Sequence, residues 1–195
     1  TNFSNEDKII TFFDHSLCRG GVMSQTEYNI FLNTIKYLLM NNYIVVLKSK
    51  YENNNLLNYL NNENHTFFNE LLKENKFYYA NKMPITHYEL IAISDVVVSF
   101  PISTIISESI CSHINTIIYD PLKNFKLNHL FLYKYPEIVS YNMKDLTEKI
   151  EKLFFNKEFN IEYNKLQNSI INDIFKIDLK NNSKEELIKY IITNN

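Results

Sequence analysis

The alternation of short apolar runs with longer amphipathic stretches constrains the fold of this 195-residue chain more than any other feature. Runs of strand length recur through the first three quarters of the chain, and each is followed by a stretch with the apolar spacing of a helix. Strands that alternate with helices form parallel sheets, because each helix returns the chain to the start of the next strand. We therefore predict an α/β fold, a doubly wound, mostly parallel and Rossmann-like sheet with C-terminal helices.

Six segments are predicted strands, the last of them at an edge of the sheet: 8–14, 43–48, 76–80, 95–100, 115–120 and 137–141. The predicted helices begin at Ser24, cover 56–72 and 84–94, begin again near Ser103 or Thr104, and then cover 144–155 and 160–192. Ser24 and Glu27 have the spacing of a helix start. We divide the chain into a Rossmann-like domain over 1–158 and a helical extension over 159–195 that packs on it.

Charge, hydropathy and cysteine usage exclude several classes of function. The net charge of −2 comes from mixed signs, which argues against a nucleic-acid partner. No apolar run approaches the roughly 20 residues of a membrane span. Cys18 and Cys111 lie far apart without a metal-ligand pattern, so we predict neither a disulfide nor a metal site. We expect a cytoplasmic protein, with the inner face of the membrane as an alternative location. The chain begins at Thr1 instead of methionine, and we expect further sequence upstream.

Ligands of open parallel sheets bind beyond the carboxyl ends of the strands, so the loops that follow the strands are the first places to examine. The loop after the first predicted strand contains the only two glycines of the chain, Gly20 and Gly21, next to Arg19. Glycine permits a positive φ angle or a close approach of the backbone to a phosphate. A glycine-dependent turn without a ligand explains the pair equally well.

Lysines follow the second predicted strand. Lys48 and Lys50 place two ammonium groups at its carboxyl end, where they are suited to a diphosphate or a sugar carboxylate. Solvent-exposed lysines are the simpler interpretation, because exposure is the usual state of this residue type.

The turn after the fourth predicted strand carries the strongest pattern. The buried strand ends, the chain turns at Pro101, and a helix begins near Ser103 or Thr104. The amide groups and hydroxyls of such a helix start suit a nucleotide diphosphate. Glu108 lies four residues after Thr104, on the same helix face, where a carboxylate can accept hydrogen bonds from both ribose hydroxyls. The alternative is an ordinary helix cap with a solvated glutamate.

This segment, together with the strand that ends at Asp120, resembles the donor site of GT-B glycosyltransferases and of the related UDP-N-acetylglucosamine 2-epimerases. In those families a strand that ends in serine or threonine leads to a Ser/Thr-rich helix start and a glutamate that holds the ribose. The resemblance covers roughly 8–155 and is specific only over 95–120. It also implies that the segment with Pro84 and His87 contacts the base or the sugar.

The resemblance implies the C-terminal, nucleotide-sugar-binding half of a GT-B enzyme of a bacterial surface-polysaccharide pathway. Arg19, Gly20, Gly21, Lys48, Ser103 and Thr104 would then surround the phosphates, and Glu108 would hold the ribose. The expected partners are a nucleotide-activated sugar, a glycan acceptor and a missing N-terminal domain that supplies the catalytic base. The catalytic residue stays unknown, with Asp14 and His15 only as donor-side candidates. The sequence contains no DxD motif, so we expect no metal and no other cofactor.

Two departures from the family pattern leave alternatives open. Phe100 and Pro101 replace the usual glycine before the Ser/Thr pair, and Lys48-Ser49-Lys50 stands where some members carry Lys-Pro-His. A non-catalytic interaction module, in which Phe100 and Pro101 block the donor pocket, is therefore one alternative. An epimerase-like protein is the other, although its acidic catalytic residues cannot be located in the sequence.

Overall fold

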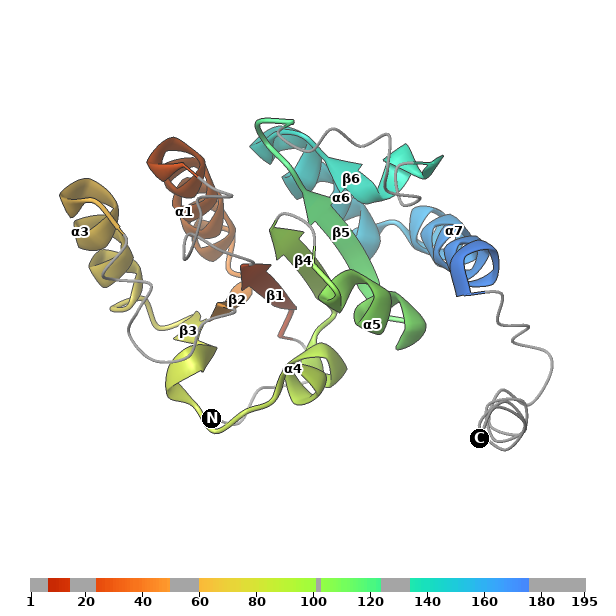
Figure 1. The fold of residues 1–195 in the computed structure, drawn as a ribbon, viewed down its shortest axis with the longest axis horizontal. Coiled ribbons are helices and arrows are strands. Elements are labelled where there is room, and N and C mark those ends of the chain that lie inside the picture. The colour runs from red at the N-terminus through yellow and green to blue at the C-terminus, as the bar shows by residue number, and fades with distance from the viewer. Residues whose placement is uncertain (1–6, 15–23, 50–59, 101–102, 124–133, 176–195) are drawn as a thin grey trace, which may run out of the picture.

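A computed structural model of the chain describes residues 7–14, 24–49, 60–100, 103–123 and 134–175. Its centre is a six-stranded sheet in which all strands are parallel, in the order β3-β2-β1-β4-β5-β6 (Figure 1). The strands are β1 (Ile9–Asp14), β2 (Ile44–Ser49), β3 (Phe77–Tyr79), β4 (Val96–Phe100), β5 (Asn115–Tyr119) and β6 (Val139–Ser140). Each matches a predicted strand to within about two residues at its ends, and β6 lies at an edge as predicted.

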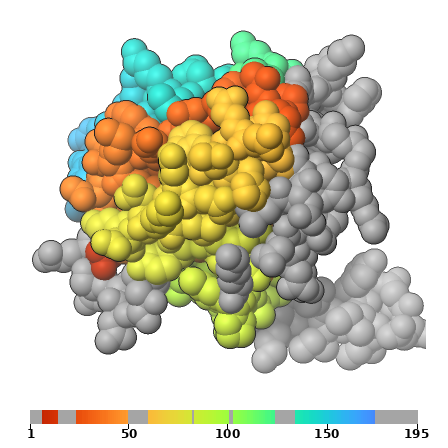
Figure 2. Space-filling model, turned by 90° about the vertical axis from the view of Figure 1, so that its left-hand side faces the viewer, coloured from red at the N-terminus to blue at the C-terminus, as the bar shows by residue number. Residues whose placement is uncertain are grey.

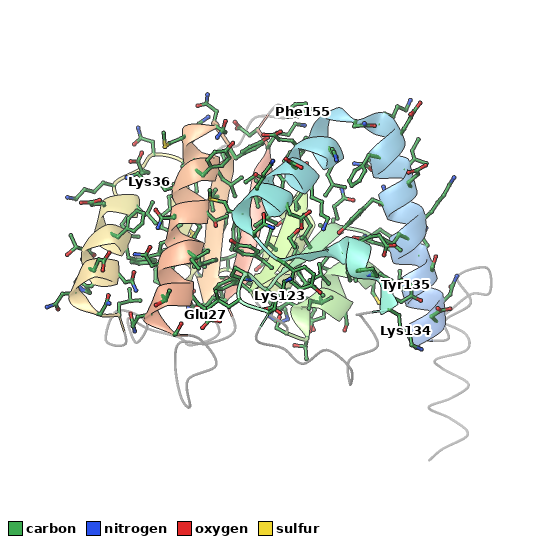
Figure 3. All side chains as sticks on the ribbon, turned by 90° about the horizontal axis from the view of Figure 1, so that it is seen from above. Glu27, Lys36, Lys123, Lys134, Tyr135 and Phe155 are labelled. Carbon is green, nitrogen blue, oxygen red and sulfur yellow. The ribbon has the colours of Figure 1, made fainter. Side chains whose placement is uncertain are left out.

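Helices cover both faces of the sheet, as a doubly wound fold requires. The helices are α1 (Gln25–Met40), α3 (Asn62–Leu71), α4 (His87–Ile93), α5 (Ile105–Cys111), α6 (Met143–Phe155) and α7 (Lys157–Phe175). In Figure 3, α3, α1, α6 and α7 stand side by side, with Phe155 toward one end of these helices and Glu27 and Lys123 toward the other. The helix predicted over 84–94 begins only at His87, because Thr86 caps it.

Alternating side chains of the strands divide the core in two. Ile10 and Phe12 of β1 belong to the larger cluster, with the buried face of α1, whereas Ile9 and Phe13 belong to a smaller cluster with Leu90 of α4. A strand that is buried on both faces has a continuous run of apolar residues. Such runs make β1 and β4 recognisable in the sequence. The space-filling view shows α1, α3 and the segment of β3 and α4 as one continuous surface at the β3 end of the sheet (Figure 2).

The predicted start of α1 is confirmed by a complete capping box. The Ser24 side chain accepts a hydrogen bond from the Glu27 amide at 3.2 Å, and the Ser24 amide donates to Glu27 Oε2 at 2.6 Å. We expect Ser24→Ala to lower the free energy of unfolding by about 1 kcal/mol, because this change leaves the Glu27 amide without its acceptor. Thermal unfolding checks this result, with Ser24→Thr as the control that keeps the hydroxyl. Equal melting temperatures for Ser24→Ala and the parent chain would contradict it.

Helix α7 attaches to the sheet where β5 lacks a neighbouring strand. β6 pairs only with Ile118 and Tyr119, so the outer side of the first half of β5 has no strand partner. Side chains of α7 take its place: Gln167 Oε1 accepts from the Thr116 amide at 2.7 Å, and Tyr163 Oη donates to the Thr116 carbonyl at 2.7 Å. Burial, followed by the nearby Asp145 and Glu137, raises the pKa of Tyr163, so the phenol remains a donor at neutral pH.

Candidate functional site

A pocket of about 320 Å³ lies beyond the carboxyl ends of β1, β2 and β4. The strand order turns back on itself between β1 and β4, where chain connections leave in opposite directions, and the pocket lies at this switch point. Its lining comes from four separate segments of the chain: Phe13, Asp14, Lys48, Ser49, His87, Ser103, Thr104, Ile105 and Glu108.

The ends of β1 and β2 form the floor of the pocket and are joined by polar side chains. Asp14 is only 4 % exposed, and its Oδ2 accepts a hydrogen bond from Ser49 Oγ at 3.2 Å. Asn81, just after β3, binds both backbone groups of Ser49: its Oδ1 accepts from the amide at 2.7 Å, and its Nδ2 donates to the carbonyl at 2.9 Å. These contacts fix the end of β2 although the next strand is only three residues long.

Lys48 supplies a cation to this pocket. It is half-buried, lies opposite Phe13 in the register of β1 and β2, and lines the pocket with it. Within the described parts of the chain, no hydrogen bond or ion pair holds its ammonium group. A cation held near a pocket without a fixed partner is suited to an anionic ligand.

The turn after β4 brings two hydroxyls to the pocket. Ser99 Oγ and Ser103 Oγ lie 3.1 Å apart and join the end of the strand to the start of the turn. Thr104 is the N-cap of α5, and its hydroxyl makes no capping hydrogen bond. The side chain of Thr104 therefore remains available to a ligand at the pocket that it lines.

Phe100 does not enter the pocket. Its side chain is 1 % exposed and lies in the larger core cluster, stacked on Phe31 with ring centroids 4.5 Å apart. It also contacts Tyr119, at a centroid distance of 5.3 Å. This phenylalanine thus fills the core beneath α1, on the face away from Phe13, and does not occupy the pocket. Pro101 lies outside the described residues.

His87 and Glu108 meet at the pocket although 20 residues separate them in the chain. His87 Nε2 lies 3.1 Å from Glu108 Oε2, which is ion-pair distance when the imidazole is protonated, and the two side chains are 40 % and 30 % exposed. The capping box of α4 fixes the backbone beside His87: the Thr86 amide donates to Glu89 Oε2 at 2.8 Å, and the Glu89 amide donates to Thr86 Oγ1 at 3.2 Å. The Thr86 amide, followed by the Thr86 hydroxyl that donates to the same carboxylate oxygen at 2.8 Å, lowers the pKa of Glu89.

Five of the predicted site residues therefore line one pocket: Lys48, His87, Ser103, Thr104 and Glu108. Pro84 is exposed and is not among the lining residues, so its contact with a base or sugar stays a prediction. Arg19, Gly20 and Gly21 lie outside the described residues, as do His15, Cys18 and Lys50. The binding roles of all these residues stay predictions as well.

Sequence reasoning missed Asn81 and the contact between His87 and Glu108. Asn81 directly follows the third strand, which is a position for site residues in parallel sheets, but in an Asn-rich chain its type carries little information. The position of His87 at the first turn of a capped helix could be read from Thr86 and Glu89, whose spacing is that of a capping box. Its contact with Glu108 depends on how α4 and α5 pack and has no sequence signal.

A larger cavity of about 790 Å³ lies at the opposite end of the sheet, next to the starts of β1 and β2 and the end of α1. Its lysines already have partners: Lys8 lies over the Phe154 ring at 5.5 Å, Lys76 Nζ donates to the Asn42 carbonyl at 3.1 Å, and Lys152 lies over the Phe159 ring at 5.7 Å. Ligands of parallel sheets bind at the carboxyl ends of strands, so this cavity is the weaker candidate.

The described part of the chain lacks two further features, a cluster of metal ligands and a membrane-spanning helix. No group of three or more His, Cys, Asp or Glu side chains there is placed to hold a metal ion. Among the same residues, no helix combines the length and the apolar character that crossing a membrane requires.

Comparison with known proteins identifies the fold. No protein-family profile matches the chain, and no curated protein sequence matches it. Among solved structures, the chain is similar to the wall teichoic acid polymerase TagF, with a TM-score of 0.60 and 14 % identity over 99 % of this chain and 45 % of that one. It is also similar to a putative UDP-N-acetylglucosamine 2-epimerase from Listeria monocytogenes, with a TM-score of 0.56 and 11 % identity over 92 % of this chain and 47 % of that one.

These structural neighbours have the GT-B fold, and the chain spans less than half the length of either. At such low identities the similarity defines the fold and not the activity. It confirms the predicted class: the chain is an α/β protein with a Rossmann-like parallel sheet and C-terminal helices, of the kind found in GT-B proteins.

Proposed function

We propose that the chain is the donor-binding half of a GT-B glycosyltransferase of a surface-polysaccharide pathway, and that it binds a nucleotide-activated sugar. The observation that carries the proposal is the pocket at the switch point between β1 and β4, which gathers Lys48, His87, Ser103, Thr104 and Glu108. Open α/β sheets bind nucleotides at this place. The fold of the structural neighbours is consistent with a role related to sugar nucleotides.

Four of the lining residues have a chemical task in this proposal. Lys48 and the hydroxyls of Ser103 and Thr104 contact the phosphates, together with Arg19, Gly20 and Gly21 of the loop after β1. Glu108 accepts hydrogen bonds from the ribose hydroxyls. Fixed dipoles and cations stabilise the leaving phosphate as the bond to the sugar breaks, which is how transfer would proceed without a metal ion. A preceding domain would bind the glycan acceptor and supply the catalytic base.

A titration of nucleotides tests the proposal. We expect UDP, CMP, GDP or CDP to bind the chain with heat that isothermal calorimetry detects at millimolar concentration or below. If no member of this panel binds, the donor-binding role is wrong, and the non-catalytic interaction module becomes the better interpretation of the fold.

Glu108→Gln is the sharper test of the site. The amide that replaces the carboxylate is neutral, so its oxygen accepts the hydrogen bonds of the ribose hydroxyls more weakly than a charged oxygen does. We expect nucleotide affinity to fall by roughly 1–3 kcal/mol, which is about 5- to 150-fold. Glu74→Gln is the matched control, because Glu74 is exposed and lies outside the pocket. An unchanged affinity for Glu108→Gln would remove this residue from the site.

An epimerase-like activity is the second candidate. It is favoured by the structural similarity to the Listeria protein and by the two carboxylates, Asp14 and Glu108, that line one pocket. Incubation of the chain with UDP-N-acetylglucosamine, followed by proton NMR of the sugar, distinguishes the two. Inversion at C2 would support the epimerase, whereas binding without any change at C2 supports the donor-binding domain.

A further inference from the structure

One oxygen of Glu108 is turned away from solvent at the pocket. Glu108 Oε2 is buried and has no hydrogen-bond partner among the described residues, although His87 Nε2 lies 3.1 Å from it. The pair is close enough for an ion pair, but it is not aligned as a hydrogen bond. A buried carboxylate oxygen without a partner is costly, and a small rotation of the imidazole would supply the missing N–H group. His87 is thus the nearest group able to orient this carboxylate.

The histidine is itself held in place by its neighbours. It is the first residue of α4, directly after Thr86, whose capping box with Glu89 fixes the helix start. The Tyr88 ring lies beside the imidazole, at a centroid distance of 4.0 Å. Glu108 lies on α5, on the other side of β4 in the sequence, so the contact joins two helices at the edge of one pocket. A donor on a helix start fixed in this way is suited to restricting the rotamers of Glu108.

We propose that His87 is a positioning residue that directs Glu108 toward the ribose of the bound nucleotide. His87 engages Oε2, and Oε1 is left to accept hydrogen bonds from the sugar hydroxyls. This inference rests on the proposed donor-binding function and adds to it a ribonucleotide preference. His87 then acts through Glu108, in place of the direct contact with base or sugar that the family resemblance implies.

A double-mutant cycle on ribonucleotide preference tests this inference. The quantity measured is the ratio of dissociation constants for the 2′-deoxy and the ribose form of the tightest-binding nucleotide. We expect a ratio of about tenfold in the parent chain, because one hydroxyl hydrogen bond to a charged acceptor is lost in the deoxy form. Glu108→Gln should lower the ratio, because a neutral amide oxygen accepts the hydroxyl hydrogen bond more weakly than a carboxylate does. His87→Ala should lower it by about threefold or more, with a smaller effect on the affinity for the deoxy form.

The remaining variants distinguish a positioning role of His87 from other roles. In the Glu108→Gln background, His87→Ala should leave the ratio unchanged, because the carboxylate that the histidine engages is gone. His87→Gln, which keeps an N–H donor, should retain part of the preference, and His65→Ala on α3 should retain all of it. Circular dichroism of each variant shows whether the fold is intact.

The outcomes distinguish this inference from the proposed function. If the parent chain binds no nucleotide, both are wrong. If nucleotides bind and Glu108→Gln lowers the ratio, but His87→Ala does not, the donor site stands and the positioning role is wrong. If His87→Ala lowers the affinity for both forms equally, or lowers the ratio equally in the Glu108→Gln background, His87 contacts the ligand by itself and the inference is also overturned.

Discussion

Replacing Phe100 by alanine should lower the free energy of unfolding by about 3–5 kcal/mol, because it removes a fully buried aromatic ring and leaves a cavity. The ring stacks on Phe31 and contacts Tyr119, so α1, β4 and β5 all lose packing in this variant. Urea unfolding followed by circular dichroism measures the change. Phe155→Ala is the matched control: Phe155 is 73 % exposed, and its loss should change stability by no more than about 0.5 kcal/mol.

A second substitution of Phe100 distinguishes between two hypotheses for the chain, a donor-binding domain and a non-catalytic interaction module. Phe100→Leu keeps an apolar side chain in the core and should leave nucleotide affinity unchanged, because Phe100 does not line the pocket. Calorimetric titration of this variant beside the parent chain gives the comparison. If Phe100→Leu bound a nucleotide that the parent chain does not bind, the phenylalanine would block the site after all, and our placement of its ring would be wrong.

The positions of the central strands β1 and β4 were predictable because these strands are buried on both faces. Val96, Val97 and Val98 are all buried, and such a run of β-branched residues between a helix and a turn indicates a central parallel strand without further information. The start of α1 was predictable for a local reason as well, since a capping box lies within four residues. Local patterns of this kind do not depend on how distant elements pack.

The candidate site was predictable in part, for a topological reason. Lys48 lies at the carboxyl end of β2 and Glu108 follows β4. Parallel strands bring their carboxyl ends to one edge of the sheet, so these two regions of the chain had to come together. The side-chain partners within the site were not predictable. The hydrogen bond between Ser49 and Asp14, the two bonds from Asn81 and the approach of His87 to Glu108 depend on the exact separation of elements. Sequence periodicity does not report that separation.

In the C-terminal extension, too, the helix was predictable and its side-chain contacts were not. Helical spacing predicted a helix over 160–192, and α7 is present over Lys157–Phe175, whereas 176–192 lies outside the described residues. The spacing did not reveal that Gln167 and Tyr163 replace a missing strand along β5, because a buried glutamine in a helix looks like any polar residue of a solvent-facing side. The division of the chain at residue 158 stays a prediction, but the hydrogen bonds to Thr116 attach α7 directly to the sheet.

Loss of the two α7 side chains that bind Thr116 should have the second large effect on stability. Gln167 is 2 % exposed and Tyr163 is 3 % exposed, so a Thr116 backbone group that loses its partner cannot turn to water. Each unpaired buried group lowers the free energy of unfolding by about 1–3 kcal/mol. The double variant Gln167→Leu with Tyr163→Phe should therefore lower it by about 2–6 kcal/mol. The Ile114 carbonyl also loses the Gln167 amide, but it keeps the Thr116 hydroxyl at 2.9 Å.

Chemical unfolding of the two single variants and the double variant measures these costs and their coupling. The two side chains bind opposite groups of one residue, so their effects need not add. Lys165→Leu is the control: it introduces the same leucine at an exposed position of the same helix, two residues before Gln167. If the free energy of unfolding of Gln167→Leu lies within about 0.5 kcal/mol of that of the parent chain, water or another group reaches Thr116. In that case α7 would be an appendage on β5 and not a substitute for a strand.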